Sequence, residues 1–242
     1  MNPRKFVILK AGTTFPDIAA QLGDFDDWLL AGLGLPDERI EIREVWRDAE
    51  LPEPEDCAGV IMTGAHAMVT DRLPWMRRLL DWLPRLVEAG VPYLGICFGH
   101  QMLAEAMGGR VDFHPGGREI GCVDLNLHAP AAADPLFQGL PSRFSALAVH
   151  AQSVRDLPPD AVLLAGNNFE THHAFRVGTQ AWGIQFHPEF NSERMAAYVH
   201  RLAPQLRAAG QDCGRIHGCL CDTPIAASLL PRFASLAHPH FS

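Results

Sequence analysis

The predicted fold is decided by one stretch of sequence, Tyr93-Leu94-Gly95-Ile96-Cys97-Phe98-Gly99-His100-Gln101. An apolar strand enters a Gly-x-Cys-x-Gly turn, and a helical pattern leaves it. This pattern is the cysteine counterpart of a nucleophile elbow, a strained strand-to-helix turn that presents its central side chain. Glycines two positions away on either side let the chain segments approach closely. The positive end of the following helix lies beneath the Cys97 sulfur and favours the thiolate.

Taken alone, the motif also fits a structural cysteine at the end of a strand, so a partner base is needed to decide. The segment Gly183-Ile184-Gln185-Phe186-His187-Pro188-Glu189 supplies one. An apolar strand ends at Phe186, and His187 follows at the edge where open α/β sheets form their sites. Pro188 stiffens the turn and places Glu189 close enough to orient the ring. The three side chains match the logic of a triad: Cys97 attacks, His187 moves the proton and Glu189 fixes the His tautomer.

The first half of the chain alternates between strand and helix patterns, which predicts an α/β fold. We expect a mostly parallel central sheet flanked by helices on both faces. The predicted strands are residues 6–9, 40–46, 59–62, 91–96, 120–127, 146–149, 162–165, 174–177 and 181–186. The predicted helices are residues 17–33, 74–88, 99–107 and 192–208. Pro84 should bend or break the second helix, and Ser192 is a candidate N-cap of the last.

A single main domain over residues 1–210 is the simplest organisation, because the sequence shows neither an internal repeat nor a low-complexity linker. Residues 211–242 have no clear period and are assigned as a C-terminal extension of unknown role. Trp28, Trp75 and Trp82 occur at helical spacing and are expected in the core.

Composition excludes several classes of function. The 242 residues carry a formal net charge of -8 with interspersed signs, which argues against a nucleic-acid groove. No segment reaches the roughly 18 apolar residues needed to span a bilayer, so no membrane association is expected. The N-terminus lacks the apolar region of a secretory signal, and we expect a cytoplasmic protein.

The cysteines outside the two motifs, and the pair His172 and His173, are not expected to take part in the chemistry. Six cysteines in a cytosolic chain of this size do not predict a disulfide framework. Cys57 and Cys122 are expected as small core residues, and His172 and His173 as surface residues. The tail residues Cys213, His217, Cys219 and Cys221 are soft ligands at a spacing unusual for zinc, so we expect no metal. The chain has no P-loop and no dinucleotide motif, and no cofactor is expected.

The two motifs together resemble the class I glutamine amidotransferases, in particular the glutaminase domain of GMP synthase and its stand-alone relatives, which include γ-glutamyl peptidases. The resemblance covers about residues 5–205, with the motifs in the family's order. It implies a flavodoxin-like fold, with Cys97 as nucleophile, His187 as base and Glu189 as the third triad member.

The resemblance also implies further site residues. The backbone amides of Ala65 and Phe98 would form the oxyanion hole, and Gly64 precedes the first donor. Gln101 would help to hold the glutamyl group. His150 lies in a segment, residues 148–152, whose backbone contacts that group in the family. His66 follows the oxyanion turn and is expected to line the site.

Two departures from the family pattern stand out. The family's Ser-Gly-Gly-Pro turn is Thr63-Gly64-Ala65-His66 here, and its Ser-His-Gly-Asp segment is Val149-His150-Ala151-Gln152. A backbone donor survives the change from glycine to alanine where φ is negative. The second change removes the acidic residue and leaves the contact to the substrate's α-amino group unassigned.

Three functions fit the sequence. The first is a glutaminase or amidotransferase subunit that releases ammonia from glutamine through a thioester and passes it to a separate synthase subunit. The second is a self-sufficient peptidase or hydrolase of γ-glutamyl peptides or amines. The third is a non-catalytic regulatory protein on the same scaffold, against which the complete triad argues. The partner would in each case be glutamine or a γ-glutamyl small molecule.

Overall fold

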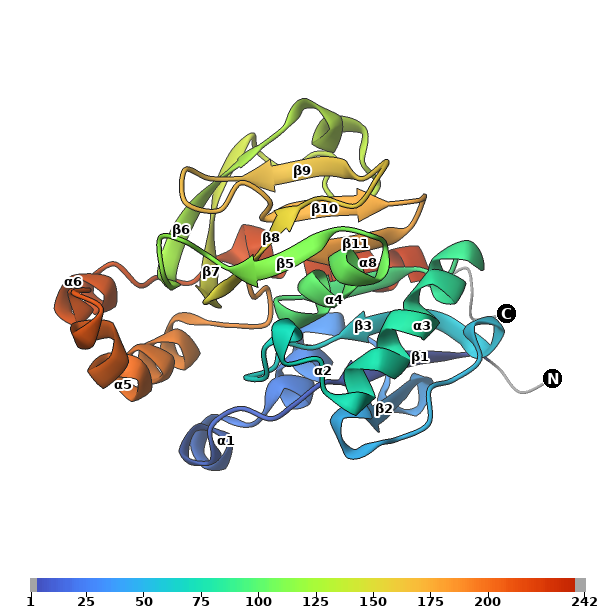
Figure 1. Cartoon of the computed structure of the whole chain (residues 1–242), viewed down its shortest axis with the longest axis horizontal. Helices are drawn as coiled ribbons and strands as arrows, with labels where there is room; N and C mark the ends of the chain where they lie inside the picture. The colour runs from blue at the N-terminus through green and yellow to red at the C-terminus, as the bar shows by residue number, and fades with distance from the viewer. Residues whose placement is uncertain (1–3, 238–242) are drawn as a thin grey trace.

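The computed structural model describes residues 4–237, and within them a nine-stranded sheet organises the fold (Figure 1). In spatial order its strands are β2 (Ile40–Glu44), β1 (Lys5–Lys10), β3 (Cys57–Met62), β4 (Tyr93–Ile96), β11 (Ala181–Ile184), β10 (Ala174–Val177), β9 (Val162–Gly166), β6 (Glu119–Leu127) and β7 (Arg143–His150). The strands from β2 to β11 pair in parallel, and those from β10 to β7 are antiparallel. The predicted α/β class is confirmed.

Helices cover both faces of the parallel half because its strands are apolar on both sides. In β1, Phe6 and Ile8 face a core cluster with α2 (Phe25–Leu33) and α8 (Leu229–Ala237). The alternate residues of β1, Val7 and Leu9, face a second cluster with α3 (Pro74–Glu88) and α4 (Phe98–Ala106). Figure 1 shows α3 and α4 in front of the sheet and α8 behind it. The three tryptophans expected in the core are buried.

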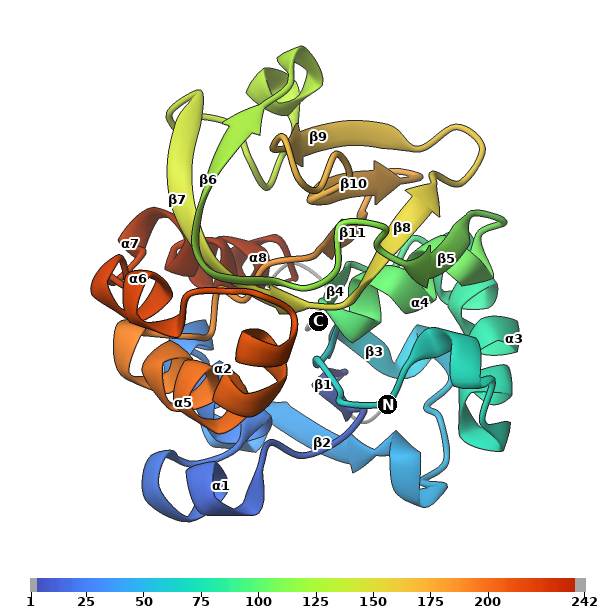
Figure 2. The same cartoon turned by 60° about the vertical axis from the view of Figure 1, so that its left-hand side comes forward.

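The remaining helices gather beside the antiparallel half. Apolar residues of α5 (Ser192–Ala208) form a third cluster with β6 and β7, and Ile216 of α6 (Cys213–Gly218) packs against it. Figure 2 shows α5 and α6 next to one another beside that end of the sheet. The other short elements are α1 (Pro16–Leu22), α7 (Pro224–Ala227) and 3-10 turns at Asp37–Arg39, Val45–Arg47, Pro54–Asp56, Val69–Asp71 and Ala129–Ala133.

Several local predictions differ from the structure. The single helix expected at residues 17–33 is two helices, because Gly23 adopts φ 80° and Asp24 caps α2 in a capping box. Asn191, rather than Ser192, caps α5, since its side chain accepts from the Arg194 amide at 2.9 Å. The helix α3 continues through Pro84 without a break.

A two-stranded antiparallel ribbon was not anticipated by the sequence pattern. It pairs β5 (Arg110–Phe113) with β8 (Gln152–Asp156), separately from the main sheet. β8 follows β7 after Ala151 alone, so the chain leaves the sheet immediately beyond His150. This exit places Gln152 and its neighbours beside the carboxyl ends of the parallel strands.

Residues 211–237 pack on the main domain, and the boundary at residue 210 stays a prediction. Leu229, Leu230 and Phe233 of α8 belong to the same core cluster as the sheet. Cys57 is buried as expected, but Cys122 is only half-buried, and its sulfur lies 3.3 Å from that of the exposed Cys221. The prediction of Cys122 as a core residue is therefore wrong.

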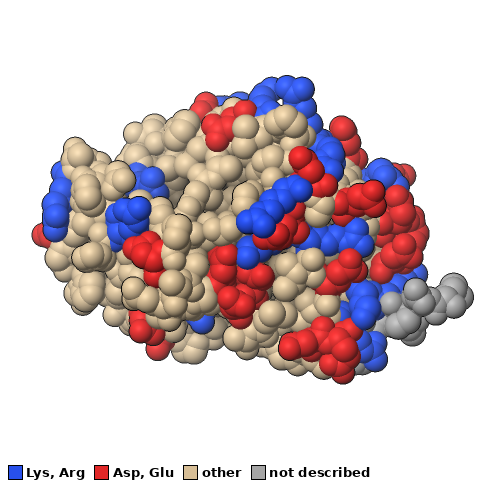
Figure 3. Space-filling model, turned by 90° about the horizontal axis from the view of Figure 1, so that it is seen from below, with Lys and Arg blue, Asp and Glu red and all other residues tan. Residues whose placement is uncertain are grey.

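The surface of the described residues carries both signs of charge. Basic and acidic side chains are interspersed on the face in Figure 3, without an extended basic patch among its described residues. In residues 4–237, no helix has both the length and the apolar content to cross a bilayer.

Candidate active site

Three neighbouring parallel strands end at the candidate site. β3 leads into Thr63 and Gly64, β4 leads into Cys97, and β11 ends three residues before His187. The Cys97 amide donates to the Ile184 carbonyl at 2.8 Å, and the His187 amide donates to the Leu147 carbonyl of β7 at the same distance. The topology therefore brings the two motifs together across 90 residues of sequence.

Cys97 occupies a strained turn between β4 and α4. Its φ of 50° lies in a region that L-residues rarely adopt, a conformation that persists only where the surroundings impose it. A Cβ on Gly95 would come within 2.3 Å of the Gly99 carbonyl oxygen, and one on Gly99 within 2.6 Å of the Met62 carbonyl oxygen. Both glycines are therefore required by close backbone approach. The side chain of Cys97 lines a pocket while remaining 8% exposed.

His187 and Glu189 form a buried pair behind the cysteine. His187 Nδ1 lies 2.7 Å from Glu189 Oε1, and the other ring nitrogen, Nε2, is buried without a hydrogen-bond partner among the described residues. Burial opposes a charge on the ring, but the contacts with Glu189 and Cys97 outweigh it and raise the pKa of His187 to about 10. These contacts favour the protonated form of the ring.

The loop after β3 lies against this pair. A Cβ on Gly64 would meet His187 Cε1 at 3.1 Å and Cys97 Cβ at 3.7 Å, so only glycine fits without displacing the ring. Ala65, Cys97 and Phe98 line one pocket, where the predicted oxyanion donors would have to lie. The Thr63 hydroxyl accepts from the Ala11 amide at 2.9 Å and ties the loop to the end of β1.

Gln101 and Gln152 connect the walls of the pocket. Gln101 Nε2 donates to the Gln152 carbonyl at 2.8 Å and to Gln185 Oε1 at 2.9 Å. The Gln152 side chain accepts from the Val69 amide at 3.0 Å and donates to the Thr70 hydroxyl at 2.6 Å. Gln152, at the position of the family's acidic residue, thus holds two loops together.

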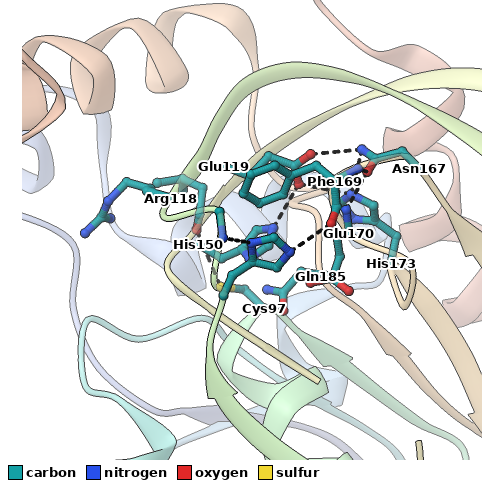
Figure 4. A network of polar contacts seen from close by, with 12 residues as sticks. Cys97, Arg118, Glu119, His150, Asn167, Phe169, Glu170, His173 and Gln185 are labelled. Carbon is teal, nitrogen blue, oxygen red and sulfur yellow. Dashed lines mark hydrogen bonds and ion pairs between the residues drawn. The ribbon is translucent and has the colours of Figure 1, made fainter. Parts of the chain in front are cut away.

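A buried network supports His150. His150 Nε2 and His173 Nε2 lie 2.9 and 3.0 Å from the same oxygen of Glu119, and Asn167 Nδ2 donates to the other oxygen at 2.9 Å (Figure 4). His150 Nδ1 lies 3.0 Å from the Gln152 carbonyl. Both ring nitrogens of His150 therefore face protein acceptors. The ring fixes the segment that lines the pocket and has no nitrogen left for a substrate.

This network corrects one prediction. His173 is fully buried and His172 half-buried, so the expectation of two surface histidines is wrong. Glu119, His150 and His173 have ligand atoms within 4.8 Å of one another and are chemically able to hold a metal. The two imidazoles already satisfy one Glu119 oxygen, however, and both rings lower the pKa of that carboxyl against the opposing effect of burial. His173 Nδ1 is buried without a hydrogen-bond partner among the described residues, and His173 Nε2 lies 3.0 Å from both Glu119 Oε2 and Asn167 Nδ2.

The pocket contains residues that the motifs did not reveal. Val149, His150 and His66 line it as expected. The unanticipated lining residues that lie toward α5 are Phe15, Phe25, Arg118, Tyr198 and Leu202. The ring centroids of Phe15 and His66 are 4.2 Å apart, and the Tyr198 hydroxyl bonds to Thr14 Oγ1 at 2.6 Å. No short motif marks these residues, because they come together only in the folded chain.

The charge on His187 leads to a testable pH dependence. Because two negative groups stabilise the imidazolium, the ring should stay protonated through neutral pH and titrate as the pH rises through about 10. In a Glu189→Gln variant the largest stabilising charge is gone, so the titration should move to lower pH. Histidine-selective NMR across pH 5–11 checks this. An unshifted titration in the variant would contradict the assigned contact.

Comparisons with known proteins place the chain in a family. The model of the family "Glutamine amidotransferase class-I" matches residues 34–202. Gamma-glutamyl peptidase 5 of Arabidopsis thaliana is 25% identical and covers 86% of this chain and 84% of its own length. One subunit of the glutamine-hydrolysing GMP synthase of Methanopyrus kandleri is 32% identical, over 57% of this chain and 71% of its own length.

The aligned share of other relatives is smaller. Gamma-glutamyl peptidase 4 of Arabidopsis thaliana is 28% identical over 64% of either chain, and a GMP synthase of Porphyromonas gingivalis is matched over 27% of its length. The chain thus spans less than two thirds of the length of these relatives.

A solved glutamine amidotransferase of Methylobacillus flagellatus has a TM-score of 0.72 at 26% identity, covering 100% of this chain and 94% of its own. The chain belongs to the class I glutamine amidotransferase family.

Proposed function

We propose that this chain hydrolyses a γ-glutamyl amide with Cys97 as nucleophile, His187 as general acid and base, and Glu189 as the group that orients His187. The observation that carries the proposal is the strained Cys97 at an elbow beside the buried His187–Glu189 pair. A thiolate beside an imidazolium is the activated form of a cysteine nucleophile.

The proposed reaction has two halves. The Cys97 thiolate attacks the γ-carbonyl carbon, and the resulting oxyanion accepts hydrogen bonds from the Ala65 and Phe98 amides. His187 then donates its proton to the departing nitrogen, which leaves as ammonia or an amine. In the second half His187 takes a proton from water and the resulting hydroxide attacks the γ-glutamyl thioester. The C–S bond then breaks, glutamate leaves, and the Cys97 thiolate and the His187 imidazolium are restored.

Two versions of this activity differ in their need for a partner. A glutaminase subunit would pass ammonia to a separate synthase, as the name of the Methanopyrus relative suggests for that protein. A γ-glutamyl peptidase would act alone, and the peptidase relative that covers 86% of this chain favours testing peptides first. No cofactor takes part in either version.

Glutamate release by the purified chain, from glutamine and from γ-glutamyl peptides, tests the proposal. Strong release from a peptide that is lost in Cys97→Ser would identify a self-sufficient hydrolase. Weak release from every substrate, together with alkylation of Cys97 by a glutamine-like electrophile, would identify a chain that needs a synthase partner. Absence of both reactions would reject a catalytic role and favour the regulatory alternative.

A further inference from the structure

The pocket has an unequal balance of charge. Arg118 is the one lysine or arginine among its lining residues, and none of those residues is an aspartate or a glutamate. The carboxylates near the pocket already have partners: Glu119 and Glu189 lie against histidines, and Asp24, which acts on His66, pairs with Lys10 at 2.8 Å. Apart from the Cys97–His187 pair, the charged side chain that lines the pocket is therefore positive, and it favours a ligand group of negative charge.

Arg118 is held in position by its backbone, and its side chain has no protein partner among the described residues. Its carbonyl accepts from Gln211 Nε2 at 2.7 Å, and the next residue, Glu119, is fixed by the histidine network. Within residues 4–237 the guanidinium makes no ion pair or side-chain hydrogen bond, although Arg118 is partly buried. Figure 4 shows Arg118 pointing away from Glu119, His150 and His173.

The guanidinium also lies within the electrostatic reach of the reacting groups. Burial lowers the pKa of Arg118, and the Cys97 thiolate opposes this effect. The same guanidinium helps to lower the pKa of His66, whose ring lines the pocket. The cation is thus near the nucleophile without being neutralised by a carboxylate of the described residues. A planar guanidinium matches a carboxylate with two parallel hydrogen bonds, which makes a substrate carboxylate its natural partner.

We propose that Arg118 binds a carboxylate of the substrate, so that the pocket selects γ-glutamyl compounds by that group. This inference rests on the proposed γ-glutamyl activity and extends it to a substrate class. The carboxylate comes from one of two places, the α-carboxylate of the glutamyl group or a carboxylate on the departing amine. Both present the same chemistry to Arg118, and substrate analogues separate them.

Three substrates form the test. They are γ-glutamylglycine, its glycinamide analogue without the amine-side carboxylate, and its α-amide without the glutamyl α-carboxylate. In the wild-type chain, one amide should lose about 10- to 100-fold in kcat/KM relative to the parent. In Arg118→Met, the ratio of kcat/KM for the parent to kcat/KM for that amide should fall to about one. Arg118→Lys should keep part of the difference. The amide affected identifies which carboxylate Arg118 binds.

Arg143→Met is the matched control, since Arg143 is exposed on β7 and pairs with Asp124 at 2.7 Å. It should leave both ratios unchanged. Ratios that are the same in wild type and in both Arg118 variants would overturn the inference, as would a wild type that accepts both amides as well as the parent.

Binding to the Cys97→Ala variant separates this inference from the proposed reaction. Calorimetry with the same three compounds, with and without Arg118→Met, needs no turnover. Carboxylate-dependent binding that requires Arg118, without hydrolysis by the wild type, would reject the reaction and keep the inference. Hydrolysis in which neither binding nor kcat/KM depends on Arg118 would reject the inference and keep the reaction.

Discussion

Cys97→Ala is expected to reduce γ-glutamyl hydrolysis by roughly 10⁴- to 10⁶-fold, because the thiolate is the proposed nucleophile and no second cysteine lines the pocket to replace it. His187→Ala should cost a similar factor, and the double variant no more than either single change, since triad members act as a unit. Initial rates of glutamate release at saturating substrate measure all three. Residual activity within tenfold of the wild type in Cys97→Ala would remove Cys97 from the mechanism.

Stability measurements on the same residue provide a control against simple unfolding. The φ of 50° at Cys97 strains alanine as much as cysteine, whereas glycine adopts it freely. Cys97→Gly should therefore be more stable than Cys97→Ala by roughly 1 kcal/mol and equally inactive. An active, stabilised glycine variant is incompatible with a role for the thiol.

Gly95→Ala is expected to lower the free energy of unfolding by about 3 kcal/mol or more and to abolish activity. The new Cβ would lie 2.3 Å from the Gly99 oxygen and 2.7 Å from the His100 nitrogen, both of them backbone atoms of α4. The helix α4 would have to move away from β4, and this movement would displace Cys97 at the turn between them. Urea unfolding followed by circular dichroism measures the loss.

The matched control is Gly218→Ala at the end of α6. An added Cβ there meets no atom within 4 Å, and the φ of Gly218 is not positive. Its effect should stay within about 1 kcal/mol. Equal stabilities of the Gly95 and Gly218 variants would show that the elbow tolerates a side chain, against the close approach described for it.

The parallel half of the fold was predictable because its signals are local. Buried strands that alternate with amphipathic helices identify βα units, and α3 occurs at the predicted residues. The two motifs also located the strand ends that meet at the site. Cys97, His187 and Glu189 could thus be chosen from spacing and residue type, while their catalytic roles stay a proposal.

The rest of the site could not be predicted because it depends on contacts between distant segments. His173 is buried beside Glu119, a polar partner that lies 54 residues away in the sequence. Arg118 and Tyr198 reach the pocket only when α5 packs beside β6. The sequence after residue 210 shows no clear helical periodicity because α6, α7 and α8 are short and pack on different surfaces.

The central claim is that Cys97 carries the γ-glutamyl group during the reaction, and intact-protein mass spectrometry tests it most directly. The chain would be mixed with the γ-glutamyl compound it turns over fastest and quenched in acid within one turnover. The account predicts a mass increase of one γ-glutamyl group, located on the peptide that contains Cys97 and absent in Cys97→Ser. Turnover without any adduct on Cys97, or an adduct on another residue, would contradict it.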